Sequence, residues 1–188
     1  MFDTDIRAVL VDQLRSEHSG TDTLVRHEVG ICAGKRRVDV AVVNGEFSGY
    51  EIKSDFDTLT RLAGQATAYG QVLDRAIIGT THRHLEHALD SLPHWWGVFM
   101  AERISGDVKL EELRAPVLNS DLDPFALAQL LWRDEAMEEL RSRDLAKGLS
   151  AKARHYVWLV LAEALPLSEL KDVVRTRLKE RQEWPGGQ

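Results

Sequence analysis

The stretch RRVDVAVVNGEFSGYEIKSD, residues 36–55, decides the predicted fold. Two runs rich in Val, Phe, Tyr and Ile surround Asn44-Gly45, and this pattern is typical of a β-hairpin. Side chains alternate between the two faces of a strand, so Glu51 and Lys53 share one face. By the same rule, Asp39 lies on the face opposite to the valines beside it. The hairpin therefore carries charged groups on one side of each strand.

The length of the turn sets which of these charged residues meet. A two-residue turn mixes charged and apolar side chains on both faces. A three-residue connection over residues 44–46 pairs Val43 with Phe47, and it also brings Asp39 opposite Glu51. In that register the apolar side chains share one face: Val38, Val40, Tyr50 and Ile52. We therefore predict the three-residue connection or an equivalent bulge.

Two opposed carboxylates repel each other, and a divalent cation removes that penalty. Asp39 and Glu51 are therefore candidate Mg²⁺ ligands, with Mn²⁺ as a substitute and Glu28 of the preceding strand as a third acid. Lys53, beside Glu51, can assist an attacking water or neutralise charge on phosphorus. These groups suit the hydrolysis of a phosphodiester bond. The alternative is an ordinary solvated ladder of charged strand residues.

The segments around the hairpin predict the rest of the architecture. Apolar spacing predicts helices over residues 3–17, 55–74 and 82–92, and residues 76–81 form a short apolar run typical of a buried central strand. Residues 95–113 read as two edge strands around a Ser-Gly-Asp turn. Three helical segments follow, over residues 123–143, 150–165 and 167–184. This order predicts an α/β fold with one mixed central sheet flanked by helices.

A change of texture near Asn119 divides the chain into a predicted core, residues 1–118, and a C-terminal helical subdomain, residues 119–188, packed on it. The last helix carries an apolar stripe: Leu167, Leu170, Val174 and Leu178. A packed annex or a homodimer contact explains that stripe. Its basic residues could instead contact DNA, but neighbouring acids dilute their charge, so we favour packing.

Composition narrows the class of protein without naming a function. The chain has 188 residues, a formal charge of −6 and one cysteine, Cys32. The negative charge argues against a protein that coats nucleic acid, although a local basic site stays possible. No apolar run reaches the roughly 20 residues that span a bilayer, and the first residues are acidic where a signal peptide is basic. We therefore expect a cytoplasmic protein.

Three segments resemble the PD-(D/E)XK nuclease superfamily, in particular its small stand-alone bacterial and phage members: RVDVAVV, YEIKSD and GQATAYGQVLD. The superfamily pattern has an acid at the end of one strand, an acid-x-lysine on the next strand, and a helix behind the sheet. These positions fall on Asp39, Glu51 and Lys53, while Val38 stands where a proline often precedes the first acid. The resemblance covers roughly residues 5–80 and implies a restriction-endonuclease-like core.

The resemblance also implies roles for single residues. In this superfamily the two acids hold Mg²⁺, the main-chain carbonyl at the position of Ile52 can help, and the lysine assists the nucleophilic water. Glu28 resembles an additional upstream acid, but other members carry it on the first helix, which nominates Asp5 or Asp12. Gln65 and Tyr69 match the Gln-x-x-x-Tyr element of the RecB-like branch. There the glutamine supports the active site and the aromatic places the nucleic-acid strand or the helix.

We therefore expect a Mg²⁺-dependent nuclease that hydrolyses DNA phosphodiester bonds. Lys35, Arg36 and Arg37 are expected to steer the phosphate backbone into the site, or else to form a solvated turn. Core packing is the alternative role for Tyr69. The alternative functions are a non-catalytic DNA-binding or protein-interaction module with the same fold, and a helical interaction protein. Substrate form, cutting at ends or internally, and pathway (repair, restriction or phage replication) stay open.

Overall fold

The computed structural model describes residues 1–184 and contains one six-stranded mixed sheet. Its strands follow chain order: β1 (Leu24–Ile31), β2 (Arg36–Val43), β3 (Phe47–Lys53), β4 (Arg75–Thr80), β5 (Gly97–Ile104) and β6 (Asp107–Arg114). β3, β4 and β5 run parallel to one another, and the remaining neighbours are antiparallel. The predicted α/β class with a mixed central sheet is confirmed.

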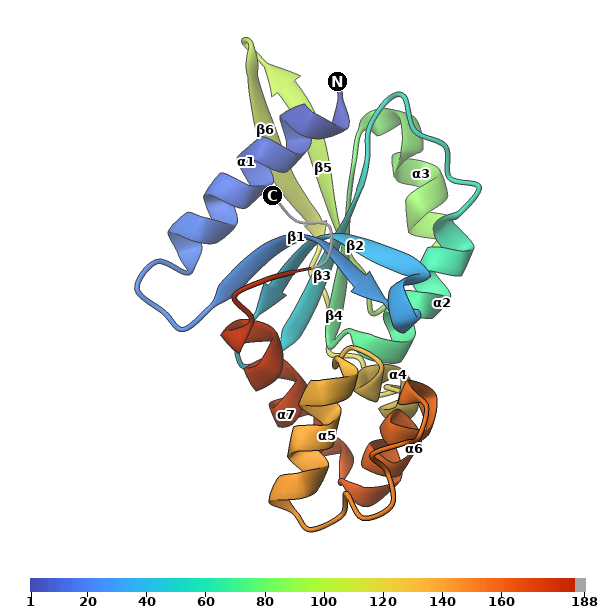
Figure 1. Ribbon diagram of the computed structural model, residues 1–188. Coiled ribbons are helices and arrows are strands. Elements are labelled where there is room, and N and C mark those ends of the chain that lie inside the picture. The colour runs from blue at the N-terminus through green and yellow to red at the C-terminus, as the bar shows by residue number, and fades with distance from the viewer. Residues whose placement is uncertain (185–188) are drawn as a thin grey trace.

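Helices cover both faces of this sheet (Figure 1). One face packs against α1 (Asp3–Glu17), whose buried residues Ile6, Leu10 and Leu14 form one apolar core with Val40 and Ile52. The other face packs against α2 (Leu62–Val72) and α3 (His82–Ser91), and its apolar residues belong to a second, larger core. Both faces of the hairpin are therefore buried.

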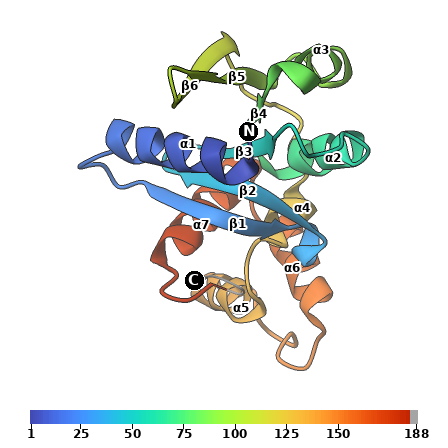
Figure 2. The same ribbon diagram turned by 90° about the horizontal axis from the view of Figure 1, so that it is seen from above.

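Four helices form the C-terminal extension: α4 (Pro124–Ala128), α5 (Arg133–Ser142), α6 (Arg154–Ala164) and α7 (Leu167–Glu180). Figure 2 shows them on the β1–β2 side of the sheet, away from β5 and β6. The helical segment predicted over residues 123–143 is two helices, because short i to i+3 turns follow α4. A new helix, α5, then begins where the Glu135 carboxylate accepts a hydrogen bond from Trp132 N at 2.7 Å. Among residues 1–184, no helix combines the length and apolarity needed to cross a bilayer.

The apolar stripe of the last helix packs within its own chain. Leu170, Val174 and Leu178 are buried in the same core as the apolar residues of α2 and β2. The stripe therefore does not supply the homodimer contact considered from the sequence. The division at residue 118 stays a prediction, with the last strand ending at Arg114 and α4 beginning at Pro124.

The strand assignment of residues 95–113 was partly wrong. Of the two strands in this segment, only β6 lies at an edge of the sheet, since β5 is hydrogen-bonded to β4 on one side and β6 on the other. Residues 97–101 are all buried, which suits an interior strand.

The predicted three-residue hairpin connection is confirmed, because Val43 pairs with Phe47 and Val40 with Tyr50. The expected sorting of the valines is wrong at one position. Val38 packs in the core on the α2 side, whereas Val40 packs in the core on the α1 side. The alternation is interrupted at the level of Glu28 on the neighbouring strand β1, which has a left-handed backbone (φ 55°).

A buried carboxylate joins the extension to the sheet. Asp74, between α2 and β4, accepts a hydrogen bond from Phe47 N at 2.8 Å and is paired with Lys171 of α7 at 2.5 Å. Arg175, one turn further along α7, lies 3.6 Å from the same carboxylate. The start of β3 and the last helix are therefore held by one acid.

Asp74→Ala is expected to lower the free energy of unfolding by roughly 3 kcal/mol, because it leaves the buried Phe47 N–H and the half-buried Lys171 and Arg175 without their partner. Chemical denaturation measures the change. Asp172→Ala is the matched control, since Asp172 also pairs with Arg175 but has a side chain that is 73% exposed. It is expected to cost less than about 1 kcal/mol. Equal effects of the two substitutions would contradict this account of Asp74.

Candidate active site

A polar pocket of about 430 Å³ opens where β2 and β3 separate, and it brings most of the predicted residues together. Acids and bases come from α1, β1, the β1–β2 connection, β2, β3 and the start of α2. The predicted residues that line it are Glu28, Lys35, Arg36, Arg37, Asp39, Glu51, Ile52, Lys53 and Gln65. Tyr69 does not line it, and neither do Asp5 and Asp12, the alternatives to Glu28.

Glu51 and Lys53 form a buried ion pair at the floor of this pocket. The Lys53 ammonium donates to Glu51 Oε1 at 2.7 Å, and the two residues are only 4% and 1% exposed. A solvated ladder of charged residues is therefore excluded for this strand. Ion pairs as buried as this one are costly to desolvate and often add nothing to stability. The pair is therefore a candidate functional group.

Two side chains of α2 complete the hydrogen bonds of Glu51. Gln65 Nε2 donates to Oε1 at 2.5 Å, and the Tyr69 hydroxyl donates to Oε2 at 2.5 Å. The i, i+4 spacing of Gln65 and Tyr69 places both on the helix face that covers β3. The carboxylate of Glu51 is therefore held in one orientation by three donors.

Tyr69 does not reach the pocket surface, so its predicted contact with nucleic acid is wrong in this structure. Its ring is fully buried and stacks on Trp96 at 5.3 Å between centroids. Burial and the nearby charge of Glu51 raise the pKa of its hydroxyl well above the ordinary value, so the hydroxyl stays protonated and donates. Core packing combined with support of Glu51 describes its role.

Asp39 lies at the point where the hairpin strands part. The pairing of β2 with β3 extends to Val40, and beyond it the Asp39 carboxylate accepts a hydrogen bond from Ile52 N at 2.8 Å. Burial and the charge of Glu51 raise the pKa of Asp39 to about 7, although Arg7 opposes the shift. Two carboxylates thus share a site that disfavours a second negative charge.

Two arginines hold Glu28, the predicted third acid. Its carboxylate lies 3.2 Å from Arg7 and 3.6 Å from Arg37. Its left-handed backbone is uncommon for a residue with a side chain, and such strained positions cluster at functional sites. Glu28 therefore lines the pocket as part of an ion-pair network.

The first helix contributes an acid to the pocket, but it is not one of the two nominated. Asp3 lines the pocket, whereas Asp5 pairs with Arg103 at 3.1 Å and Asp12 is exposed outside it. The helix face decides this outcome, because Asp3 and Arg7 share the face of α1 that lines the pocket, whereas Asp5 does not. The sequence signal available was the i, i+4 pair of Asp3 and Arg7.

Arg7 is the functional candidate that the sequence did not reveal. Its guanidinium donates to the main-chain carbonyl of Asp39 at 2.9 Å and lies 3.7 Å from the Asp39 carboxylate. It also pairs with Asp3 at 3.0 Å and with Glu28. Arg7 therefore links three acids from separate elements and partly neutralises them.

Mg²⁺ fits the donors of this pocket in kind. Asp39 and Glu51 offer carboxylate oxygens, and Ile52 lines the same hollow. Residues 1–184 contain no group of three or more His, Cys, Asp or Glu side chains arranged to hold a metal ion. A set of two carboxylates matches Mg²⁺ sites that rely on water and substrate phosphate for the other ligands.

Comparisons with known proteins identify the family but not the reaction. The model of the family described as bacteriophage P4 protein cII matches residues 2–184. Protein cII of Enterobacteria phage P4 is 24% identical over 177 residues, which cover 94% of this chain and 66% of the phage protein. A solved protein of unknown function from Silicibacter pomeroyi is 18% identical, with a TM-score of 0.47 over 80% of this chain and 97% of that one. The chain belongs to the bacteriophage P4 protein cII family.

Proposed function

We propose that this protein is a Mg²⁺-dependent nuclease that hydrolyses DNA phosphodiester bonds. The observation that carries the proposal is the buried Glu51–Lys53 pair beside Asp39 in an open polar pocket. Perturbed titratable groups gathered in a hollow are a common mark of a catalytic site. The resemblance of the hairpin to the PD-(D/E)XK pattern supports the same conclusion. Family membership assigns no reaction, and the phage relative is a longer protein.

Each side chain then has a defined task. Asp39 and Glu51 would hold the ion with help from the Ile52 carbonyl, and when bound Mg²⁺ supplies positive charge beside the scissile phosphate. Lys53 can orient the attacking water, or it can neutralise the charge that develops on the phosphate oxygens. Gln65 and Tyr69 are positioning residues, since both act through Glu51.

The rim of the pocket suits a phosphate backbone. Lys35, Arg36 and Arg37 are exposed and line the pocket on the side of the β1–β2 connection. Arginine binds phosphate oxygens with paired donors, and lysine adds a point charge. These side chains can therefore hold the DNA backbone over the two carboxylates.

One observation favours a second candidate, a non-catalytic nucleic-acid-binding module. Both oxygens of Glu51 already accept hydrogen bonds from Lys53, Gln65 and Tyr69, and Glu28 is occupied by arginines. A fully satisfied network of this kind can serve structure alone. Titration calorimetry with Mn²⁺ separates the candidates, because the module requires no metal binding through Asp39 and Glu51.

Lys53→Gln is expected to lower Mg²⁺-dependent DNA cleavage by roughly 10²- to 10⁴-fold, because it removes the cation that orients the attacking water and neutralises charge on phosphorus. Glutamine keeps a hydrogen-bond donor for Glu51, so the fold is retained, which circular dichroism checks. The control is Lys109→Gln on the edge strand β6, where the lysine is exposed and lies outside the pocket. Cleavage by Lys53→Gln at the unsubstituted rate would overturn the role of Lys53.

Tyr69→Phe tests positioning against DNA binding. Loss of the hydroxyl leaves one oxygen of Glu51 without its donor, so we expect turnover to fall several-fold and the free energy of unfolding to fall by about 1–2 kcal/mol. The affinity for DNA is expected to be unchanged, since Tyr69 is fully buried. Tyr156→Phe on α6, where the residue is exposed, is the matched control. A loss of affinity as large as the loss of turnover contradicts the positioning role.

The raised pKa of Asp39 predicts how stability changes with pH. Between about pH 4, where a free aspartate titrates, and pH 7, the native state binds more protons than the unfolded state. The free energy of unfolding of the metal-free protein is therefore expected to fall as pH rises through this window. Asp39→Asn keeps an oxygen for Ile52 N but cannot ionise, so denaturation curves in EDTA should show a flatter pH dependence. An equally steep decline in the variant contradicts this assignment.

A further inference from the structure

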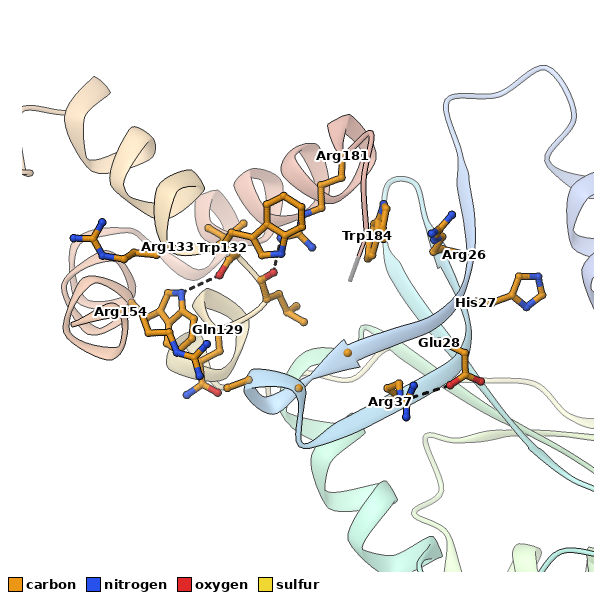
Figure 3. Close-up of a pocket in the computed structure, with 16 residues that line it drawn as sticks. Arg26, His27, Glu28, Arg37, Gln129, Trp132, Arg133, Arg154, Arg181 and Trp184 are labelled. Atoms are coloured by element: carbon orange, nitrogen blue, oxygen red, sulfur yellow. Dashed lines mark hydrogen bonds and ion pairs between the residues drawn. The ribbon is translucent and has the colours of Figure 1, made fainter. Parts of the chain in front are cut away.

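A second groove lies beside the carboxylate pocket, between the β1–β2 hairpin and the C-terminal helices (Figure 3). Its volume is about 540 Å³. Three residues of the β1–β2 hairpin line both hollows: Glu28, Gly34 and Arg37. The two hollows therefore meet along the β1–β2 hairpin. A flexible ligand held in the groove can therefore extend directly into the pocket.

The groove concentrates positive charge in an acidic protein. Glu28 is the single acidic side chain among the residues that line the groove. Five arginines line it: Arg26, Arg37, Arg133, Arg154 and Arg181. Within residues 1–184, no carboxylate lies within ion-pair distance of Arg26 or Arg154, and the whole chain carries a charge of −6. A local excess of this kind in such a chain points to an anionic ligand.

Aromatic rings alternate with these arginines. The Arg181 guanidinium lies over the Trp132 ring at 4.6 Å and over the Trp184 ring at 5.1 Å, and Arg26 of β1 lies over Trp184 at 5.5 Å. The series runs from the helical extension to the sheet, as Figure 3 shows. Trp132 remains 42% exposed, so part of its ring is open to a ligand. Planar guanidinium and indole groups are the surfaces on which unpaired bases stack.

The stacking surface is fixed before any ligand arrives. Arg181 is paired with Glu135 at 2.6 Å and donates to the Leu130 carbonyl at 2.7 Å. Trp158 Nε1, deeper in the groove, donates to the Leu131 carbonyl at 3.0 Å, and Arg154 covers its ring. A preorganised site of this kind loses little conformational entropy when a ligand binds.

We propose that this groove binds an unpaired DNA strand and leads it to the carboxylate pocket. Exposed base faces are needed for stacking, and they are available in a single strand rather than inside a duplex. The groove has the volume of a small-ligand site, which suits single bases that stack on its rings. The assignment of DNA as the ligand rests on the proposed nuclease function.

The test measures binding without cleavage. Lys53→Gln protein is titrated into a labelled oligomer of about 12 thymidines, and fluorescence anisotropy reports the dissociation constant. Adding Trp132→Ala is expected to weaken binding roughly 5- to 150-fold with the salt dependence unchanged, because it removes stacking. Adding Arg154→Ala is expected to reduce the slope of log K against log salt by about one, since a phosphate contact is lost.

Arg83→Ala is the control, because Arg83 of α3 is exposed and lies outside both hollows. Arg154 is also exposed, so its substitution does not threaten the fold. Unchanged binding in both Trp132→Ala and Arg154→Ala overturns the groove as the binding site. Binding of a duplex as tightly as the thymidine oligomer overturns the preference for a single strand, and tighter binding of a uridine oligomer overturns DNA as the ligand.

These outcomes are separate from those of the nuclease proposal. Strand binding that depends on Trp132 and Arg154, in a protein that shows no metal-dependent cleavage, supports the groove and removes the nuclease. Cleavage that depends on Lys53 but not on Trp132 or Arg154 supports the nuclease and removes the groove as the strand-binding site.

Discussion

The rest of the site depends on the ion pair that Glu51 and Lys53 form under α2. Two charges that are nearly inaccessible to water need partners with good geometry, and here Gln65 and Tyr69 supply the remaining donors. The need of the buried Glu51 carboxylate for donors explains why a polar glutamine and a buried tyrosine occupy adjacent turns of one helix. It also brings a second carboxylate, Asp39, into a position where its ionisation is disfavoured. The two neighbouring carboxylates therefore do not readily ionise together in this pocket.

A local distortion of the hairpin opens the pocket. The left-handed backbone of Glu28 and the end of the β2–β3 pairing at Val40 occur at the same level of the sheet. Strand separation frees the Asp39 carboxylate to bind Ile52 N, and the twist moves Val38 to the other core. Arg7 reaches this opening from α1 and balances part of the negative charge. Regular pairing over the full length of both strands would have closed the pocket.

The C-terminal helices add a surface that a bare sheet with two helical layers lacks. Asp74 ties α7 to the start of β3, so the helices hold a fixed place beside the β1–β2 hairpin. That placement lines up arginines and tryptophans from both parts of the chain along one groove. The helical extension thus has a role in the proposed function besides covering apolar surface.

The amino-acid sequence by itself determined the features that depend on near neighbours. Alternation and the apolar pattern specified the hairpin register, the shared face of Glu51 and Lys53, and the common helix face of Gln65 and Tyr69. Contacts between distant segments were decided only in the tertiary structure. Arg7 meets the Asp39 carbonyl across 32 positions, and Arg181 lies beside Glu135 across 46. Spacing rules describe one helix or strand at a time, whereas such contacts depend on how elements pack, which no local pattern encodes.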